Sequence, residues 1–189
     1  MTWLVLGLVL FLGIHSVAIV APGWRDVQVM QRGEKAWKGI YSVVAIAGFV
    51  MLIVGYGLAR QSPVLLYNPP IWTRHLALLL MVPVFPLLFA AYLPGRIKSA
   101  TKHPMLAAVK IWAFAHLLAN GTLADVLLFG GFLAWAVVDR ISLKRRPPRA
   151  IPGAPPRPLN DVIAVVGGLA VYAAFVMGLH RWLIGVPPF

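Results

Sequence analysis

Long apolar stretches alternate along the chain with short segments that are rich in basic, polar and proline residues. A membrane-spanning helix needs about 20 mostly apolar residues, and six stretches compete for that status. They cover residues 2–21, 40–59, 72–92, 104–119, 122–138 and 161–184. The pattern therefore predicts an all-α integral membrane bundle of six transmembrane helices, built as a single domain over residues 1–189.

The fourth and fifth stretches are shorter than the others, and helices of that length would extend only about 24–26 Å. Asn120 and Gly121 lie between them and are typical of a tight turn. Thr122 follows as a helix cap, and Asp125 comes three residues later, which is the spacing of a capping box. We expect the two segments to form a short helical hairpin; the alternative is one long helix that tolerates Gly121.

Composition supports residence in a membrane, because 60% of the residues are hydrophobic, 12% are charged and the mean hydropathy is +0.83. The net charge of +12 does not indicate a nucleic-acid partner, since most Lys and Arg lie between the apolar stretches. They concentrate in the connections 22–39, 93–103 and 139–160, with few in the alternate connections. The positive-inside rule then predicts that these three connections are cytoplasmic and that both termini lie outside.

The last of these connections contains a basic, proline-rich cytoplasmic linker at residues 140–160, and its segment 144–158 is predicted to be extended and mobile. Cysteine is absent from the chain. This absence excludes structural disulfides, zinc held by cysteine, iron–sulfur clusters and cysteine nucleophiles.

Ionisable residues inside apolar stretches are costly to keep, so each is a candidate functional residue. The candidates are His15, His75, Lys110, His116 and Asp125, with His103 and His180 at boundaries. Counting residues from the predicted helix ends places His15 and His103 in one layer near the cytoplasm, and His75 and His116 in the opposite layer. His103 and His116 are separated by about 20 Å along one helix, so they cannot share an ion.

Imidazoles from facing helices can hold a haem iron between them, one on each face of the ring. Two other interpretations stay open for these histidines, namely hydrogen bonding between helices and a proton relay. Lys110 lies within the fourth stretch. It either extends its ammonium toward the membrane edge or faces the interior, where it could meet a carboxylate such as a haem propionate.

Two segments of the chain resemble the NnrU family of bacterial membrane proteins: FLGIHS in the first stretch and KHPMLAAVKIWAFAHLLANGTLADVLLFGGFLAWAV. The resemblance implies an association with nitrite and nitric oxide reduction. The family is also similar to the zeta-carotene isomerase of plants and cyanobacteria, a membrane protein that holds haem b through axial histidines. Matched residue by residue, the family's histidines fall on His15, on His103 of the His-Pro motif and on His116. The possible cysteine ligand of that relative has no counterpart here.

From these observations we expect a bacterial inner-membrane protein with periplasmic termini that binds haem b. His15 and His103 are the expected iron ligands, and Lys110 and His116 are further cofactor-binding residues. The expected role is accessory to nitrite and nitric oxide reduction, with the lipid bilayer and components of the reductases as partners. The alternatives are a haem-dependent isomerase of a polyene lipid, a prenylcysteine-type membrane methyltransferase and a cofactor-free structural partner. No catalytic residue is assigned.

Overall fold

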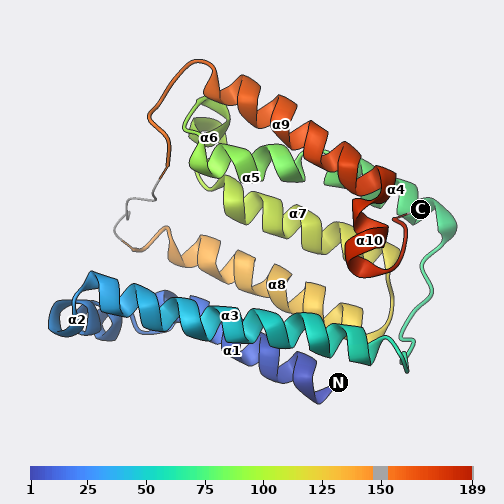
Figure 1. Ribbon diagram of the computed structural model, residues 1–189, viewed down its shortest axis with the longest axis horizontal. Coiled ribbons are helices and arrows are strands. Elements are labelled where there is room, and N and C mark those ends of the chain that lie inside the picture. The colour runs from blue at the N-terminus through green and yellow to red at the C-terminus, as the bar shows by residue number, and fades with distance from the viewer. Residues whose placement is uncertain (147–152, 189) are drawn as a thin grey trace. The chain divides into compact units, whose positions relative to one another are not determined.

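The computed structural model describes residues 1–146 and 153–188, and its regular elements are helices (Figure 1). The helices divide into two compact units. Unit 1 consists of Met1–Tyr67 and Thr122–Ser142, and unit 2 consists of Asn68–Gly121 and the described residues from Leu143 onward. The predicted single domain over the whole chain stays a prediction.

Unit 1 contains α1 (Thr2–Val20), α2 (Pro22–Arg32), α3 (Glu34–Ala59) and α8 (Leu123–Ser142). Helices α1 and α3 run antiparallel and touch through glycines. A Cβ added to Gly7 would lie 2.6 Å from the backbone nitrogen of Leu52, and one added to Gly48 would lie 2.7 Å from that of Phe11. Close contact through small residues is the usual way in which helices associate inside a membrane, where water does not drive them together.

Helix α8 packs beside α1 and α3 and is tied to α3 at its first turn. Asp125 is buried, and it accepts hydrogen bonds from the backbone nitrogen of Thr122 at 2.9 Å and from the Tyr56 hydroxyl at 2.5 Å. The nitrogen of Leu123 donates to the carbonyl of Val64, just beyond α3. The predicted capping box of Thr122 and Asp125 is therefore confirmed, since the Asp125 nitrogen also donates to the Thr122 hydroxyl at 3.3 Å.

Unit 2 contains α4 (Ile71–Met81), α5 (Val84–Tyr92), α6 (Arg96–Thr101), α7 (Pro104–Ala119) and α9 (Asn160–Ala174). A π-helical turn (Phe175–Leu179) and α10 (His180–Ile184) continue α9. Helices α4 and α5 follow each other through a bend before Pro83, and α7 and α9 pack along them. Asp161 at the start of α9 accepts hydrogen bonds from the backbone nitrogens of Arg96 and Ile97 and thereby fixes the start of α6.

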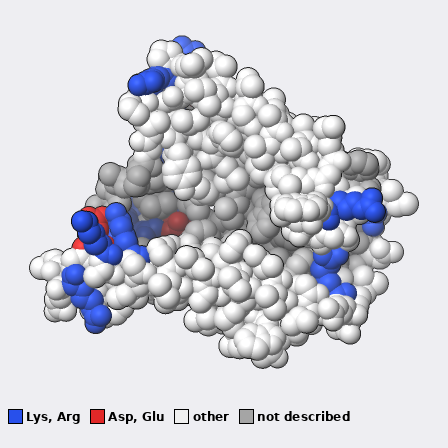
Figure 2. Space-filling model, in the orientation of Figure 1, with Lys and Arg blue, Asp and Glu red and all other residues white. Residues whose placement is uncertain are grey.

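Among the described residues, four helical stretches are long and apolar enough to cross a membrane: Thr2–Val20, Glu34–Ala59, Ile71–Tyr92 and Asn160–Ile184. Figure 2 shows Lys and Arg side chains at helix ends, with mostly uncharged surface along the helices. Six spans are not confirmed, because Pro104–Ala119 has 16 residues and α8 carries Asp125, Asp139 and Arg140 near its ends. The predicted compact hairpin is not confirmed either, since α7 belongs to unit 2 and α8 to unit 1.

The predicted linker 140–160 falls partly outside the described residues, which omit 147–152. Its later part forms hydrogen bonds near the end of α5. The nitrogen of Ala154 donates to the carbonyl of Tyr92 at 2.8 Å, and the buried Asn160 amide donates to the carbonyls of Pro94 and Pro155. These hydrogen bonds join this part of the chain to the end of α5, and the predicted mobility of the linker stays a prediction.

Candidate functional site

His15 lies in α1 of unit 1 and is half-buried. Its Nδ1 lies 2.6 Å from the carbonyl oxygen of Phe11, one turn earlier in the same helix. A carbonyl can only accept, so Nδ1 must carry the proton, and the neutral ring presents its lone pair at Nε2. Histidines that ligate a metal commonly have this arrangement, in which the second ring nitrogen donates to a backbone carbonyl.

Aromatic rings from α1, α3 and α8 surround the imidazole. The Phe11 ring stacks on it with centroids 4.2 Å apart, and Tyr41 and Trp135 approach edge-on at 5.1 and 5.9 Å. The indole Nε1 of Trp135 is buried and has no hydrogen-bond partner among the described residues. A buried donor without a partner costs about 1–3 kcal/mol, which makes this position unusual for a purely structural cluster. We call His15, Phe11, Tyr41 and Trp135 the His15 centre.

His103 is the residue before α7 and lies in a bent entry, with φ −134° and ψ 68°. The bend comes from a γ-turn at Lys102, whose φ is 60° and ψ −42° and which is closed by a hydrogen bond of 2.7 Å from the His103 nitrogen to the Thr101 carbonyl. A non-glycine residue in this conformation is strained, and such strain concentrates at functional sites. Pro104 contributes to the bend, because a proline disfavours helical backbone angles at the residue before it. His103 belongs to unit 2 and His15 to unit 1, so the predicted ligand pair stays a prediction.

Lys110 lies in the middle of α7 and is half-buried. It forms neither a hydrogen bond nor an ion pair with the residues that the structure describes. Both predicted roles, extension toward the membrane edge and contact with a carboxylate of a bound group, stay predictions.

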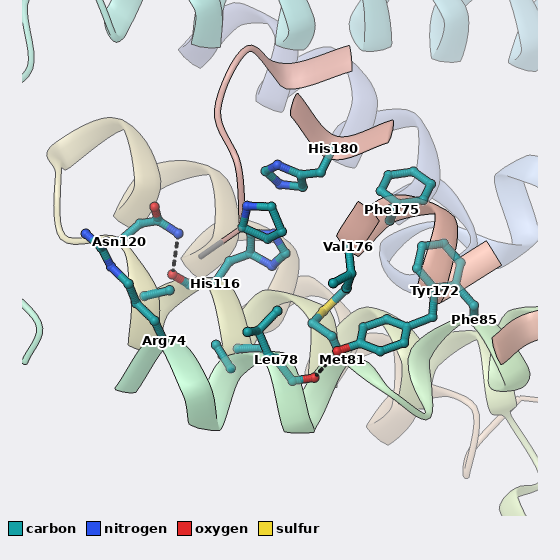
Figure 3. A pocket seen from close by; sticks show the side chains of 14 residues that line it. Arg74, Leu78, Met81, Phe85, His116, Asn120, Tyr172, Phe175, Val176 and His180 are labelled. Carbon is teal, nitrogen blue, oxygen red and sulfur yellow. Dashed lines mark hydrogen bonds between the residues drawn. The ribbon is translucent and has the colours of Figure 1, made fainter. Parts of the chain in front are cut away.

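His116, the remaining predicted binding residue, lines a pocket of unit 2 together with His180 (Figure 3). The pocket has a volume of about 140 Å³ and lies between α4, α7 and the end of α9. The Nδ1 of His116 is 2.8 Å from the carbonyl of Trp112, and that of His180 is 2.7 Å from the carbonyl of Val186. Both imidazoles therefore carry their proton at Nδ1 when neutral, as His15 does.

In the sequence His180 is only a boundary residue, and nothing in the pattern places it with His116. The π-helical turn at Phe175–Leu179 adds a residue to the helical path just before His180, and Gly178 within it has non-helical angles. Such wide turns re-aim side chains and are frequent at functional sites. A helical count along the sequence contains no signal for this turn.

The two sites differ in what they could hold. The described residues contain no group of three or more His, Cys, Asp or Glu side chains that could bind a metal ion. The unit 2 pocket, at about 140 Å³, is smaller than the usual 300–1,000 Å³ of cofactor sites and does not fit a porphyrin as it stands. The His15 centre offers the donor chemistry of an axial ligand, with Nε2 as the lone-pair nitrogen and Trp135 as a buried donor beside it.

A comparison with protein-family models matches residues 3–188 to the family described as NnrU protein, and the match covers both units. No curated protein and no solved structure matches the chain.

Proposed function

The chain belongs to the NnrU protein family, and on that premise we propose that it binds haem b at His15 in the bacterial inner membrane, as an accessory to nitrite and nitric oxide reduction. Family membership and the long apolar helices make it a membrane protein. The proposal concerns three further points: haem binding, the role in nitrogen-oxide metabolism and the identity of the membrane.

The observation that carries the haem proposal is the combination of His15 with the unpartnered donor of Trp135. The carbonyl of Phe11 holds the imidazole in the tautomer that a ligand needs, and the rings of Phe11, Tyr41 and Trp135 restrict its rotation. The buried indole N–H can donate to an acceptor oxygen of a bound group. A cofactor would then remove the cost of leaving this donor unpaired.

When bound, haem would supply one-electron chemistry and an iron that takes small diatomic ligands. The residues around His15 would position this histidine ligand. Phe11, Tyr41 and Trp135 would hold the imidazole in a fixed orientation through their ring contacts with it. His103 is the second ligand in this proposal, on the resemblance of its His-Pro motif, and the strained turn at Lys102 directly before it supports a functional role.

We also propose six membrane crossings with both termini periplasmic, and two features of the units support this topology. In unit 1, α8 passes from Asp125 beside Tyr56 to Trp135 beside His15, so it covers the same depth as α1. In unit 2, α7 runs antiparallel to α4, since Arg74 near the start of α4 and His116 near the end of α7 line one pocket. If their neighbours cross a membrane, α7 and α8 cross it with them.

The test is the absorption spectrum of the full chain, purified in mild detergent from cells supplied with iron and a haem precursor. We expect a Soret band that shifts on reduction and that is lost or strongly reduced in His15→Ala and in His103→Ala. His75→Ala is the matched control, because His75 is an exposed histidine of α4 outside both sites, and its spectrum should match that of the wild type.

Two outcomes would contradict the proposal. A folded protein without a Soret band, as judged by circular dichroism and a monodisperse elution profile, would favour the cofactor-free structural partner. A Soret band that survives His15→Ala would move the iron ligand away from the His15 centre.

A further inference from the structure

Helix α2 joins the first two apolar helices through connections of a single residue each. Ala21 alone separates it from α1, and Gly33, with a φ of 81°, alone separates it from α3. Both neighbours are long and apolar enough to cross a membrane. Because α2 is tied this closely to the adjoining ends of two spans, it must lie at the membrane surface, at the level where α1 and α3 emerge.

The axis of α2 runs across the end of this helix pair. Figure 1 shows α2 nearly end-on beside the start of α3, whereas α1 and α3 run across the picture. An edge-on contact joins it to α3, since the rings of Trp24 and Trp37 have centroids 5.8 Å apart and Trp37 is buried. When α1 and α3 span a membrane, α2 therefore lies along the membrane plane.

The exposed side of α2 is mostly apolar. Trp24, Val27 and Met30 follow one another at intervals of three residues, which places them on one stripe of the helix surface. Their exposed fractions are 54%, 44% and 84%. We call these three residues the α2 stripe. Asp26 and Gln31 border it and are exposed as well.

The side of α2 that packs on α1 and α3 is mostly polar. Its half-buried residues are Arg25, Gln28 and Val29, and the Arg25 guanidinium pairs with Asp26 at 2.9 Å. A surface helix in water has the opposite arrangement, with its apolar residues against the protein and its polar residues outward. The reversed arrangement indicates that the exposed side of α2 belongs in an apolar environment.

The bilayer is the apolar environment already present at this place. Exposed apolar side chains also occur at the adjoining ends of the two spans, at Val20 of α1 and at Ile40 and Val43 of α3. Residues 22–38 carry four basic residues against two acidic ones, which suits the phosphates of a leaflet. A tryptophan on the apolar side is typical of helices that lie in the headgroup region.

We propose that α2 is an interfacial anchor that binds the phospholipid leaflet around the ends of α1 and α3. The α2 stripe lies among the headgroups and the first methylenes of the acyl chains. Arg32, on the opposite side of the helix axis from Met30, reaches the phosphates and water. The anchor holds the end of α1 at headgroup level, and His15, five residues before Val20, then lies about 8 Å deeper.

The experiment measures the depth of single positions, which is possible because the chain has no cysteine. Met30→Cys and Arg32→Cys each receive a nitroxide spin label, and the full chain is reconstituted in liposomes of phosphatidylethanolamine and phosphatidylglycerol. Power saturation compares collisions with oxygen, which concentrates in lipid, and with a nickel chelate, which stays in water. Both positions are exposed residues at the end of α2, so they form a matched pair. We expect a several-fold higher oxygen-to-nickel ratio at position 30 than at position 32.

A second substitution tests whether the α2 stripe causes this immersion. Val27→Asp, introduced into the Met30→Cys protein, places a charge within the stripe and should lower the oxygen-to-nickel ratio at position 30. The ratio at position 32 should not change, because that label already lies in water. Circular dichroism checks that both labelled proteins keep the helical content of the wild type.

Three outcomes would overturn the proposal. A label at position 30 that collides mainly with nickel would place α2 in water. Few collisions with either reagent would mean that another part of the chain or a second copy covers the stripe. An unchanged ratio at position 30 in Val27→Asp would mean that the stripe does not hold the helix in lipid. The same measurement in His15→Ala keeps the result separate from haem binding.

Discussion

Trp135 brings a hydrogen-bond donor into unit 1 that no described residue uses. If the donor serves a bound group, its removal should affect the loaded protein more than the empty one. We expect Trp135→Phe to change the free energy of unfolding of the cofactor-free protein by no more than about 1 kcal/mol, because loss of the larger ring is offset by removal of an unpaired donor. The ratio of Soret to protein absorbance should fall clearly below that of the wild type.

The measurements are thermal unfolding in detergent and the absorption spectrum of the same preparations. Trp182→Phe provides the control, since this tryptophan is 79% exposed and lies far along the chain in α10. A large loss of stability in Trp135→Phe with an unchanged absorbance ratio would mean that the indole only fills space.

The sequence indicates the role of some residues but not of others. His15 is detectable because a polar ring in an apolar stretch is costly, and the cost indicates a use. Trp135 is not detectable in this way, since an aromatic residue in a membrane helix is ordinary. Only the tertiary contacts reveal that its N–H is buried without a partner among the residues that the structure describes. His180 joins His116 through a π-helical turn that the sequence does not signal.

At the scale of helices, the contact between α1 and α3 depends on glycines that leave no room for a side chain. A Cβ on Gly55 would overlap the backbone of Leu4, whereas one on Gly57 would meet nothing within 4 Å. We therefore expect Gly55→Ala to lower the free energy of unfolding by about 1–3 kcal/mol through overpacking. Gly57→Ala should be neutral or slightly stabilising, because alanine is the better helix former.

Circular dichroism, recorded while both variants unfold in detergent, checks this expectation. The two variants form a matched pair, because each replaces a glycine of α3 by alanine. Similar midpoints for the two variants would argue against close packing of α1 on α3.

Helix boundaries were predictable wherever a local signal sets them. The bounds Pro104–Ala119 agree with the predicted stretch because proline favours the first turn and Asn120 ends the helix with extended backbone angles. The break between α4 and α5 coincides with Pro83. Helix α2 was missed inside a predicted connection, since its residues are too polar for a span. The predicted hairpin of α7 and α8 is not confirmed, because tertiary contacts decide which helices pair. Here the hydrogen bond from Tyr56 to Asp125 joins α8 to α3.

For the whole molecule, the number of crossings can be measured cleanly because the chain has no cysteine of its own. Six crossings place Asn120 on the periplasmic side, whereas four crossings keep the whole segment between α5 and α9 in the cytoplasm. We expect Asn120→Cys to react with a membrane-impermeant maleimide in intact cells.

Gln61→Cys should react in the same way, and Lys144→Cys should react only after the membrane is opened. Labelling of Lys144→Cys in intact cells would reverse the orientation. Protection of Asn120→Cys in intact cells, together with its labelling in opened membranes, would support four crossings.

The order of segments in unit 1 has a consequence for biosynthesis. The last helix of unit 1, α8, is encoded after Asn68–Gly121 of unit 2, so the ribosome must translate through Ser142 before α8 can pack on α1 and α3. Until then, α1 and α3 are in the translocon or the lipid without α8. The His15 imidazole is uncovered on the side that Trp135 later occupies. A prosthetic group delivered during this interval would reach that imidazole before the protein closes over it.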